Sequence, residues 1–177
     1  MGQNDIILNP ITQEQVDSHS TTLDSIEFYT LLDSCVIDLN NRHSKIKKLA
    51  SKIGYKSTSK IIYLLEKSLY SDILYPMIDL ESAWIDTAIS YAGAIGLTQV
   101  MPTTAAEYGI NLPELYDPII NTRLGIQIFE ENIIFYAYSN LAEHYALTAY
   151  NKGREGARRY GAISRYSKTI LRNRDLN

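Results

Sequence analysis

The chain has 177 residues, of which 45% are hydrophobic and 21% charged, a composition that predicts one folded domain with a small appendage and excludes a disordered chain. The formal net charge of −3 argues against a dedicated nucleic-acid-binding protein. Cys35 is the single cysteine, so no disulfide can form within the chain.

The sequence shows neither a membrane anchor nor an export signal. No apolar run reaches the roughly 18 residues that a spanning helix needs, so we expect no integral membrane segment. The first twenty residues lack the basic start and apolar core of a signal peptide. We therefore expect the protein to be made in the cytoplasm.

Charge is distributed unevenly along the chain. Residues 1–41 carry seven acidic residues and no Lys or Arg, whereas residues 42–67 carry eight basic residues and one acid, Glu66. Residues 152–177 add eight basic residues against two acids. Such segments are either solvated helix faces or surfaces that meet an anionic polymer.

The N-terminal part is expected to be a helical extension. Residues 1–22 are polar and predict a tail or a loosely docked segment, and residues 23–69 predict an extension of unknown role. Within the extension, the apolar spacing fits a helix loosely over residues 23–39. It fits better over residues 45–53, which end at Gly54.

Proline, glycine and cap residues divide the rest into further helices. Three hydroxyl residues, 57–59, offer N-caps for an apolar run that ends at Leu69. Pro76 is expected to open or kink the helix that carries Glu81. A turn of small residues follows, and Pro102 begins a short helix that Gly109 ends.

The C-terminal part continues this pattern. Residues 111–116 are expected to form a loop, and Asp117 with Pro118 predicts the start of a long helix buried on more than one face. Further helices are expected over 141–150, ending near Gly153, and over 157–160 and 166–171. Because no long period-two alternation occurs, the predicted class is mainly α.

Glu81 is the residue on which a catalytic interpretation rests. It lies among apolar residues, close to Ile78, Leu80 and Trp84. Removal from water raises the pKa of a carboxyl group and lets it hold a proton near neutral pH, as a general acid for glycosidic cleavage must. The alternative is a surface carboxylate at the end of an amphipathic helix.

The spacing supports neither a second catalytic carboxylate nor a metal site. Asp79 would point away from Glu81 on a helix, and Asp86, Glu107 and Asp117 qualify only if the fold brings them back. The three histidines are scattered, and the glycines follow no strand, so we expect no metal and no cofactor.

Several separated motifs resemble one family in order and spacing. They are Glu81-Ser82, Ser90 to Ala94, Gly96 to Ala105, Asp117 with Asn121 and Gly125, Ala149 to Gly153, and Tyr166 with Ile170. Together they resemble the catalytic domain of the soluble lytic transglycosylases, which has a lysozyme-like fold. The resemblance covers residues 70–172 and leaves residues 173–177 as a tail.

The resemblance implies an activity and a set of site residues. Glu81 would cleave the bond between N-acetylmuramic acid and N-acetylglucosamine in peptidoglycan as a single acid and base, giving a 1,6-anhydro product. Ser90, Gln99, Tyr150 and Asn151 would bind the sugar, and Met101 would line the cleft.

Two details complete the expectation for the site. Tyr150 is expected to hydrogen-bond to Glu81. Thr98 replaces the methionine usual in the family, and we expect it to make the sugar cleft more polar.

Two other functions stay open at this stage. One is a muramidase of the goose-lysozyme type that uses water on the same fold, and the other is a wall-docking module without catalysis. Absence of an export signal suits a phage enzyme, either released at lysis or carried on the virion. Residues 1–69 would then bind the wall or dock to a virion or secretion-machine partner.

Overall fold

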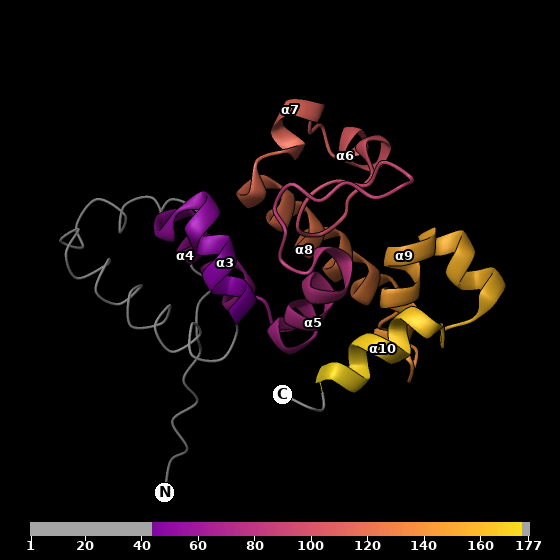
Figure 1. Cartoon of the computed structure of the whole chain (residues 1–177). Coiled ribbons are helices and arrows are strands. Elements are labelled where there is room, and N and C mark those ends of the chain that lie inside the picture. The colour runs from indigo at the N-terminus through magenta and orange to yellow at the C-terminus, as the bar shows by residue number, and fades with distance from the viewer. Residues whose placement is uncertain (1–43, 175–177) are drawn as a thin grey trace, which may run out of the picture. The chain divides into compact units, whose positions relative to one another are not determined.

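The described part of the chain, residues 44–174 of the computed structural model, is built from α-helices and loops (Figure 1). The helices are α3 (Ser44–Ile53), α4 (Tyr55–Lys67), α5 (Ser71–Ser82), α6 (Pro102–Glu107), α7 (Leu112–Leu115), α8 (Pro118–Phe135), α9 (Ala142–Tyr160) and α10 (Arg165–Arg174). Pairing of the β type among these residues is limited to isolated bridges. The predicted mainly α class is confirmed, whereas residues 1–22, the helix predicted over 23–39 and Cys35 lie outside the described residues.

Helix α8 forms the centre of the core. The Asp117 side chain accepts hydrogen bonds from the backbone N–H groups of Ile119 (2.7 Å) and Ile120 (3.2 Å), with Pro118 in the first turn, as predicted. The helix packs against both α4 and α9. The main core draws on six helices, α3, α4, α5, α8, α9 and α10, and includes Leu49, Leu65, Leu74, Phe129, Leu147 and Ile170.

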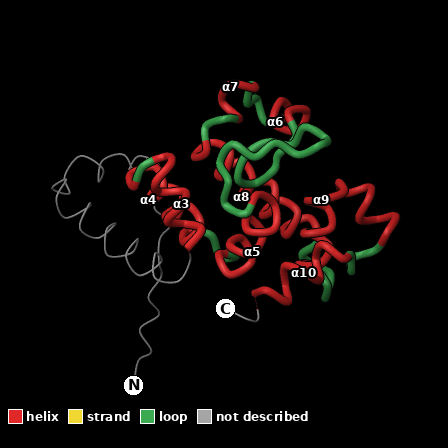
Figure 2. Tube along the Cα trace, viewed as in Figure 1, coloured by secondary structure: helices red, strands yellow, loops and turns green. Residues whose placement is uncertain are grey.

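A long loop joins α5 to α6 and is drawn in green in Figure 2. Two isolated antiparallel bridges, Ile89 with Ile95 and Ile95 with Val100, hold it in a compact form. The loop shares a second, smaller core with α6, α7 and α8, made of Ile95, Val100, Ala105, Leu115 and Leu124. This core anchors the loop, and the loop carries Ser90, Gln99 and Met101, three of the five residues predicted to bind the sugar or line the cleft.

Glycines end or interrupt three helices where the sequence predicts it. Gly54 (φ 81°) separates α3 from α4, and Gly109 (φ 74°) follows α6. Gly153 (φ 72°, ψ 161°) breaks the helical path inside α9, so the predicted stop near this residue is confirmed. These are left-handed or extended conformations with positive φ, which glycine adopts without the clash of a Cβ atom.

Three helix boundaries differ from the prediction. Helix α4 begins at Tyr55, so the expected cap residue Thr58 lies inside it and donates to the Gly54 carbonyl at 3.0 Å. Pro76 lies within α5 and does not open it, because the helix already begins at Ser71, and the alternative expectation of a kink at Pro76 stays a prediction. The expected loop 111–116 contains the single turn α7, which a reciprocal capping box between Asn111 and Glu114 stabilises.

The described helices include none with both the length and the apolar character needed to cross a bilayer.

Phe129 provides a test of the core. Its side chain is fully buried, and its ring meets Tyr70 edge-on with centroids 5.8 Å apart. We expect Phe129→Ala to lower the free energy of unfolding by about 3–5 kcal/mol because it leaves a cavity. The control Ile134→Ala, at a side chain 72% exposed on the same helix, is expected to change it by less than about 0.5 kcal/mol. Equal effects in urea unfolding would contradict this packing.

Candidate active site

Glu81 lies in the last turn of α5, just before a strained stretch of backbone. Ala83 (φ 50°) and Trp84 (φ 62°) both adopt the left-handed conformation, which costs free energy in residues other than glycine. The Ala83 N–H closes the helix on the Asp79 carbonyl at 3.0 Å, and the Trp84 side chain is buried against Tyr75. Such strain is a common companion of functional sites.

A phenol from the C-terminal helix holds the Glu81 carboxyl group. The Tyr166 hydroxyl in α10 donates to Glu81 Oε1 at 2.5 Å, across 85 positions of sequence. Burial raises the pKa of Glu81 above its ordinary value of 4.5, and the Tyr166 hydrogen bond opposes this as the smaller effect. Burial and the Glu81 charge raise the pKa of Tyr166 well above 10.0, which keeps it a donor.

Tyr150 lies nearby but bonds elsewhere. Its hydroxyl donates to the Thr98 carbonyl at 2.7 Å, and burial followed by the negative charge of Glu81 raises the pKa of this phenol. The expected hydrogen bond from Tyr150 to Glu81 is therefore wrong, because Tyr166 fills that place. No local pattern in the sequence distinguishes between two tyrosines on separate helices.

Gln99 presents an acceptor rather than a donor. Its Nε2 donates to the carbonyls of Gly96 (2.9 Å) and Ala88 (3.2 Å), which uses both amide hydrogens and leaves Oε1 for another partner. Its own backbone is left-handed, with φ 50°. The side chain therefore belongs to the loop framework and offers one directed oxygen.

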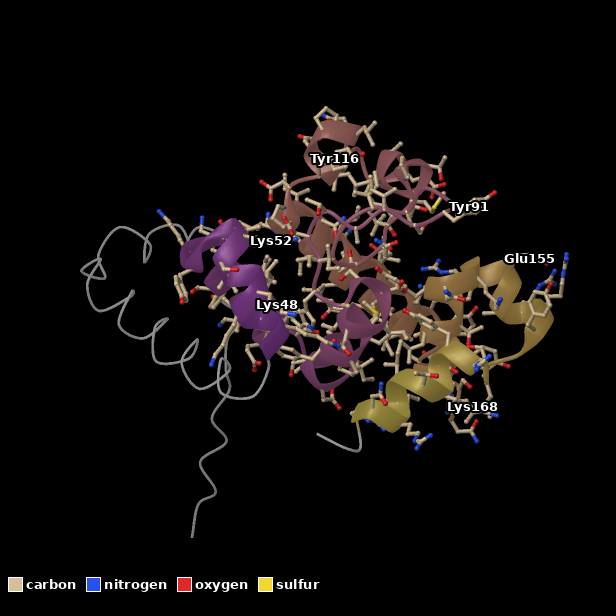
Figure 3. The ribbon with its side chains drawn as sticks, viewed as in Figure 1. Lys48, Lys52, Tyr91, Tyr116, Glu155 and Lys168 are labelled. Carbon is tan, nitrogen blue, oxygen red and sulfur yellow. The ribbon has the colours of Figure 1, made fainter. Side chains whose placement is uncertain are left out.

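Ser90 closes the small-residue turn of the same loop. Its backbone N–H donates to the Ala94 carbonyl at 2.9 Å, and its Oγ accepts from the Ala94 N–H at 3.0 Å. The hydroxyl hydrogen of Ser90 remains available to a ligand. The side chain of Tyr91, next in the chain, is fully exposed at the outer end of this turn (Figure 3).

Thr98 does not line a cleft. Its side chain is fully buried and its Oγ1 donates to Asn121 Oδ1 at 2.8 Å in α8. The expectation that Thr98 makes the cleft more polar is therefore wrong, because its hydroxyl points into the protein. Gly96 and Gly125 leave room for the contact between Thr98 and Asn121. These two glycines are the only trace of that contact in the sequence.

Met101 and Asn151 lie in different segments. Met101 is partly buried and immediately precedes α6, and Asn151 is exposed within α9, directly after Tyr150. Their predicted roles in lining and binding stay predictions.

Two of the other carboxylates considered have partners away from Glu81. Asp79 pairs with Lys45 at 2.5 Å and Asp117 caps α8. Asp86 Oδ1 is buried without a hydrogen-bond partner among the described residues and lies 4.0 Å from the Lys52 ammonium. Within residues 44–174, no cluster of three or more potential metal ligands was found. The arrangement is thus one carboxyl group with two phenols and a polar loop, suited to proton transfer by a single acid.

Comparison with known proteins identifies the family to which this helical scaffold and its partly buried acid belong. Residues 61–172 match the Transglycosylase SLT domain, so the chain belongs to that family. The predicted family and lysozyme-like fold are confirmed.

A solved structure shows the same fold. It is an inactive glutamate-to-glutamine mutant of the lytic transglycosylase Slt from Pseudomonas aeruginosa, with a TM-score of 0.53 and 22% identity. The match covers 67% of this chain and 23% of that protein, so the chain corresponds to less than a quarter of its length.

The raised pKa of Glu81 predicts a pH-dependent effect on stability. Below 4.5 the carboxyl group is protonated in both the folded and unfolded states, and as pH rises through the folded-state pKa its ionisation destabilises the fold. We expect Glu81→Gln to change the melting temperature more favourably at about pH 8 than at about pH 4. Exposed Glu155→Gln serves as control, and a Glu81→Gln effect independent of pH would contradict the assignment.

Proposed function

We propose that this protein is a peptidoglycan lytic transglycosylase in which Glu81 alone serves as acid and then base. The observation that carries the proposal is the Glu81 carboxyl group, whose pKa burial raises and which Tyr166 holds in place. Membership of the SLT family supports the reaction type. That a glutamate-to-glutamine mutant of the similar Slt protein is inactive supports a glutamate as the acid.

In the first step, Glu81 gives its proton to the glycosidic oxygen. Oε1 accepts from Tyr166, so Oε2 is the oxygen that carries the proton toward the bond between N-acetylmuramic acid and N-acetylglucosamine. The bond from C1 to this oxygen breaks, and the N-acetylglucosamine leaves with a hydroxyl group. Positive charge develops at C1, where the acetamido oxygen of the muramic acid stabilises it.

In the second step, the same carboxyl group acts as a base. Glu81, now ionised, takes the proton of the muramoyl 6-hydroxyl while the oxygen of that hydroxyl bonds to C1. The product is a 1,6-anhydro sugar, and Glu81 returns to its protonated form. No water is consumed and no second carboxylate is needed, which fits the engagement of Asp79 and Asp117 elsewhere.

The loop supplies groups to hold the sugar. The free Oε1 of Gln99 accepts from a substrate N–H, such as that of an acetamido group, and the Ser90 hydroxyl donates. Met101 and Asn151 extend this surface. The predicted action on the cell wall and the predicted partner of residues 1–69 stay predictions.

Product masses test the proposal. We expect purified peptidoglycan to release muropeptides one water lighter than reducing-end products, and Glu81→Gln to lose at least about a thousandfold in rate. Glu155→Gln, at an exposed residue on α9 (Figure 3), should keep the parent rate. Reducing-end products would establish a water-using muramidase, and an unchanged rate in Glu81→Gln would end the assignment of Glu81 as the acid. A parent protein that binds peptidoglycan but releases no muropeptides would favour a docking module.

Tyr166→Phe tests the phenol. Its hydrogen bond favours the ionised form of Glu81, so its loss should raise the Glu81 pKa further and move the alkaline limb of the rate profile to higher pH. We also expect kcat to fall about tenfold because the carboxyl group loses its orientation. Tyr160→Phe, at a side chain 69% exposed, is the control. A limb that stays or moves to lower pH would refute the role of Tyr166.

A further inference from the structure

The turn at residues 96–99 is fastened to the start of α8 by one asparagine. Asn121 Oδ1 accepts from the Thr98 N–H (3.0 Å) and from Thr98 Oγ1 (2.8 Å). Its Nδ2 donates to the carbonyls of Ile95 (2.9 Å) and Leu115 (3.3 Å). Asn121 and Thr98 are both fully buried, so this pairing, called here the Thr98–Asn121 clasp, satisfies polar groups that water cannot reach.

Two glycines let the clasp close. A Cβ atom on Gly96 would lie 2.5 Å from Asn121 Nδ2, and one on Gly125 would lie 2.4 Å from the Thr98 Cβ. The turn therefore rests directly on the helix at two points. The position of the Thr98 backbone is fixed by this contact.

The Thr98 carbonyl connects the Thr98–Asn121 clasp to the candidate active site. That oxygen accepts a hydrogen bond from the Tyr150 hydroxyl at 2.7 Å, and the pKa of this phenol is raised by burial and then by the charge of Glu81. We propose that Thr98 is a positioning residue: held by Asn121, its carbonyl keeps the Tyr150 hydroxyl turned away from Glu81, so that Tyr166 alone donates to the acid. The inference rests on the proposed function of Glu81.

The position of the Tyr150 hydroxyl matters because the pKa of Glu81 depends on how many hydrogen bonds its carboxylate accepts. Each phenol that donates to the carboxylate favours its ionised form and lowers its pKa. With one donor, the effect of burial remains the larger and Glu81 keeps a raised pKa. A second donor would oppose burial further and reduce the protonated fraction near neutral pH.

Other charged groups that meet α5 are directed to other residues of that helix. Lys45 of α3 pairs with Asp79, Glu66 of α4 accepts from Tyr75, and Arg174 of α10 lies 3.9 Å from Asp72. On the described residues, the groups that the structure relates to Glu81 itself are the two phenols, Tyr166 and Tyr150.

The experiment compares Thr98→Val with two partners. Thr98→Val removes the hydroxyl at nearly constant shape, and Thr98→Ser retains it. Thr122→Val is the matched control, because Thr122 is equally buried on α8 and donates at 2.7 Å to the Pro118 carbonyl, away from Tyr150. For each full-length protein we measure the melting temperature, kcat and KM on soluble glycan strands, and the Glu81 carboxyl titration by NMR.

We expect Thr98→Val to lower kcat about tenfold, with KM little changed, and to move the Glu81 titration and the alkaline limb to lower pH. Thr98→Ser should restore both, and Thr122→Val should lower only the melting temperature. In a Tyr150→Phe background, Thr98→Val should no longer lower the Glu81 pKa, because no hydroxyl remains to turn.

Two results would overturn the proposal: an unshifted Glu81 titration in Thr98→Val, or the same shift in the Tyr150→Phe background. The titration needs no substrate, so it decides the role of Thr98 separately from the reaction. An inactive parent with a shifted Thr98→Val titration would refute the proposed function and leave the clasp supported.

Discussion

The hydrogen bond from Tyr166 to Glu81 is the contact on which the candidate site depends. It joins α10 to the last turn of α5, so the carboxyl group has its position only when the C-terminal helix is in place. Burial gives Glu81 its raised pKa and the phenol gives it an orientation, with opposite effects on its charge. A general acid needs both, and here they come from elements far apart in sequence.

The rest of the structure holds α10 and the loop where this contact requires them. Thr148 of α9 donates to the Ala162 carbonyl at 2.6 Å, and Ser164 and Ser167 exchange hydrogen bonds at the start of α10. Arg174 then pairs with Glu143 at 2.8 Å near the other end of the helix.

The first described helices also support the site. Helices α3 and α4 contribute Leu49 and Leu65 to the same core as α5 and α10. Leu49 precedes the family match, so a residue outside the match contributes to the core that carries Glu81.

Local signals in the sequence predicted much of this, and long-range contacts account for what they missed. Asp117 with Pro118, Gly109 and Gly153 mark helix ends because capping and positive φ are local requirements. Partial burial of Glu81 followed from its apolar neighbours. The choice of Tyr166 over Tyr150 as its partner did not, because it depends on which helix returns to α5. The burial of Thr98 was missed for the same reason, since only the approach of Asn121 and Gly125 directs the hydroxyl inward.

The central claim is that the fold withdraws Glu81 from water and thereby raises the pKa of its carboxyl group. The most direct measurement is the carboxyl-carbon NMR titration of Glu81 in the unmodified protein, with Glu81→Gln identifying the resonance. The account predicts a midpoint clearly above the ordinary value of 4.5. A midpoint at or below that value would show a solvated or charge-stabilised carboxylate, and the account of Glu81 as the acid would be contradicted.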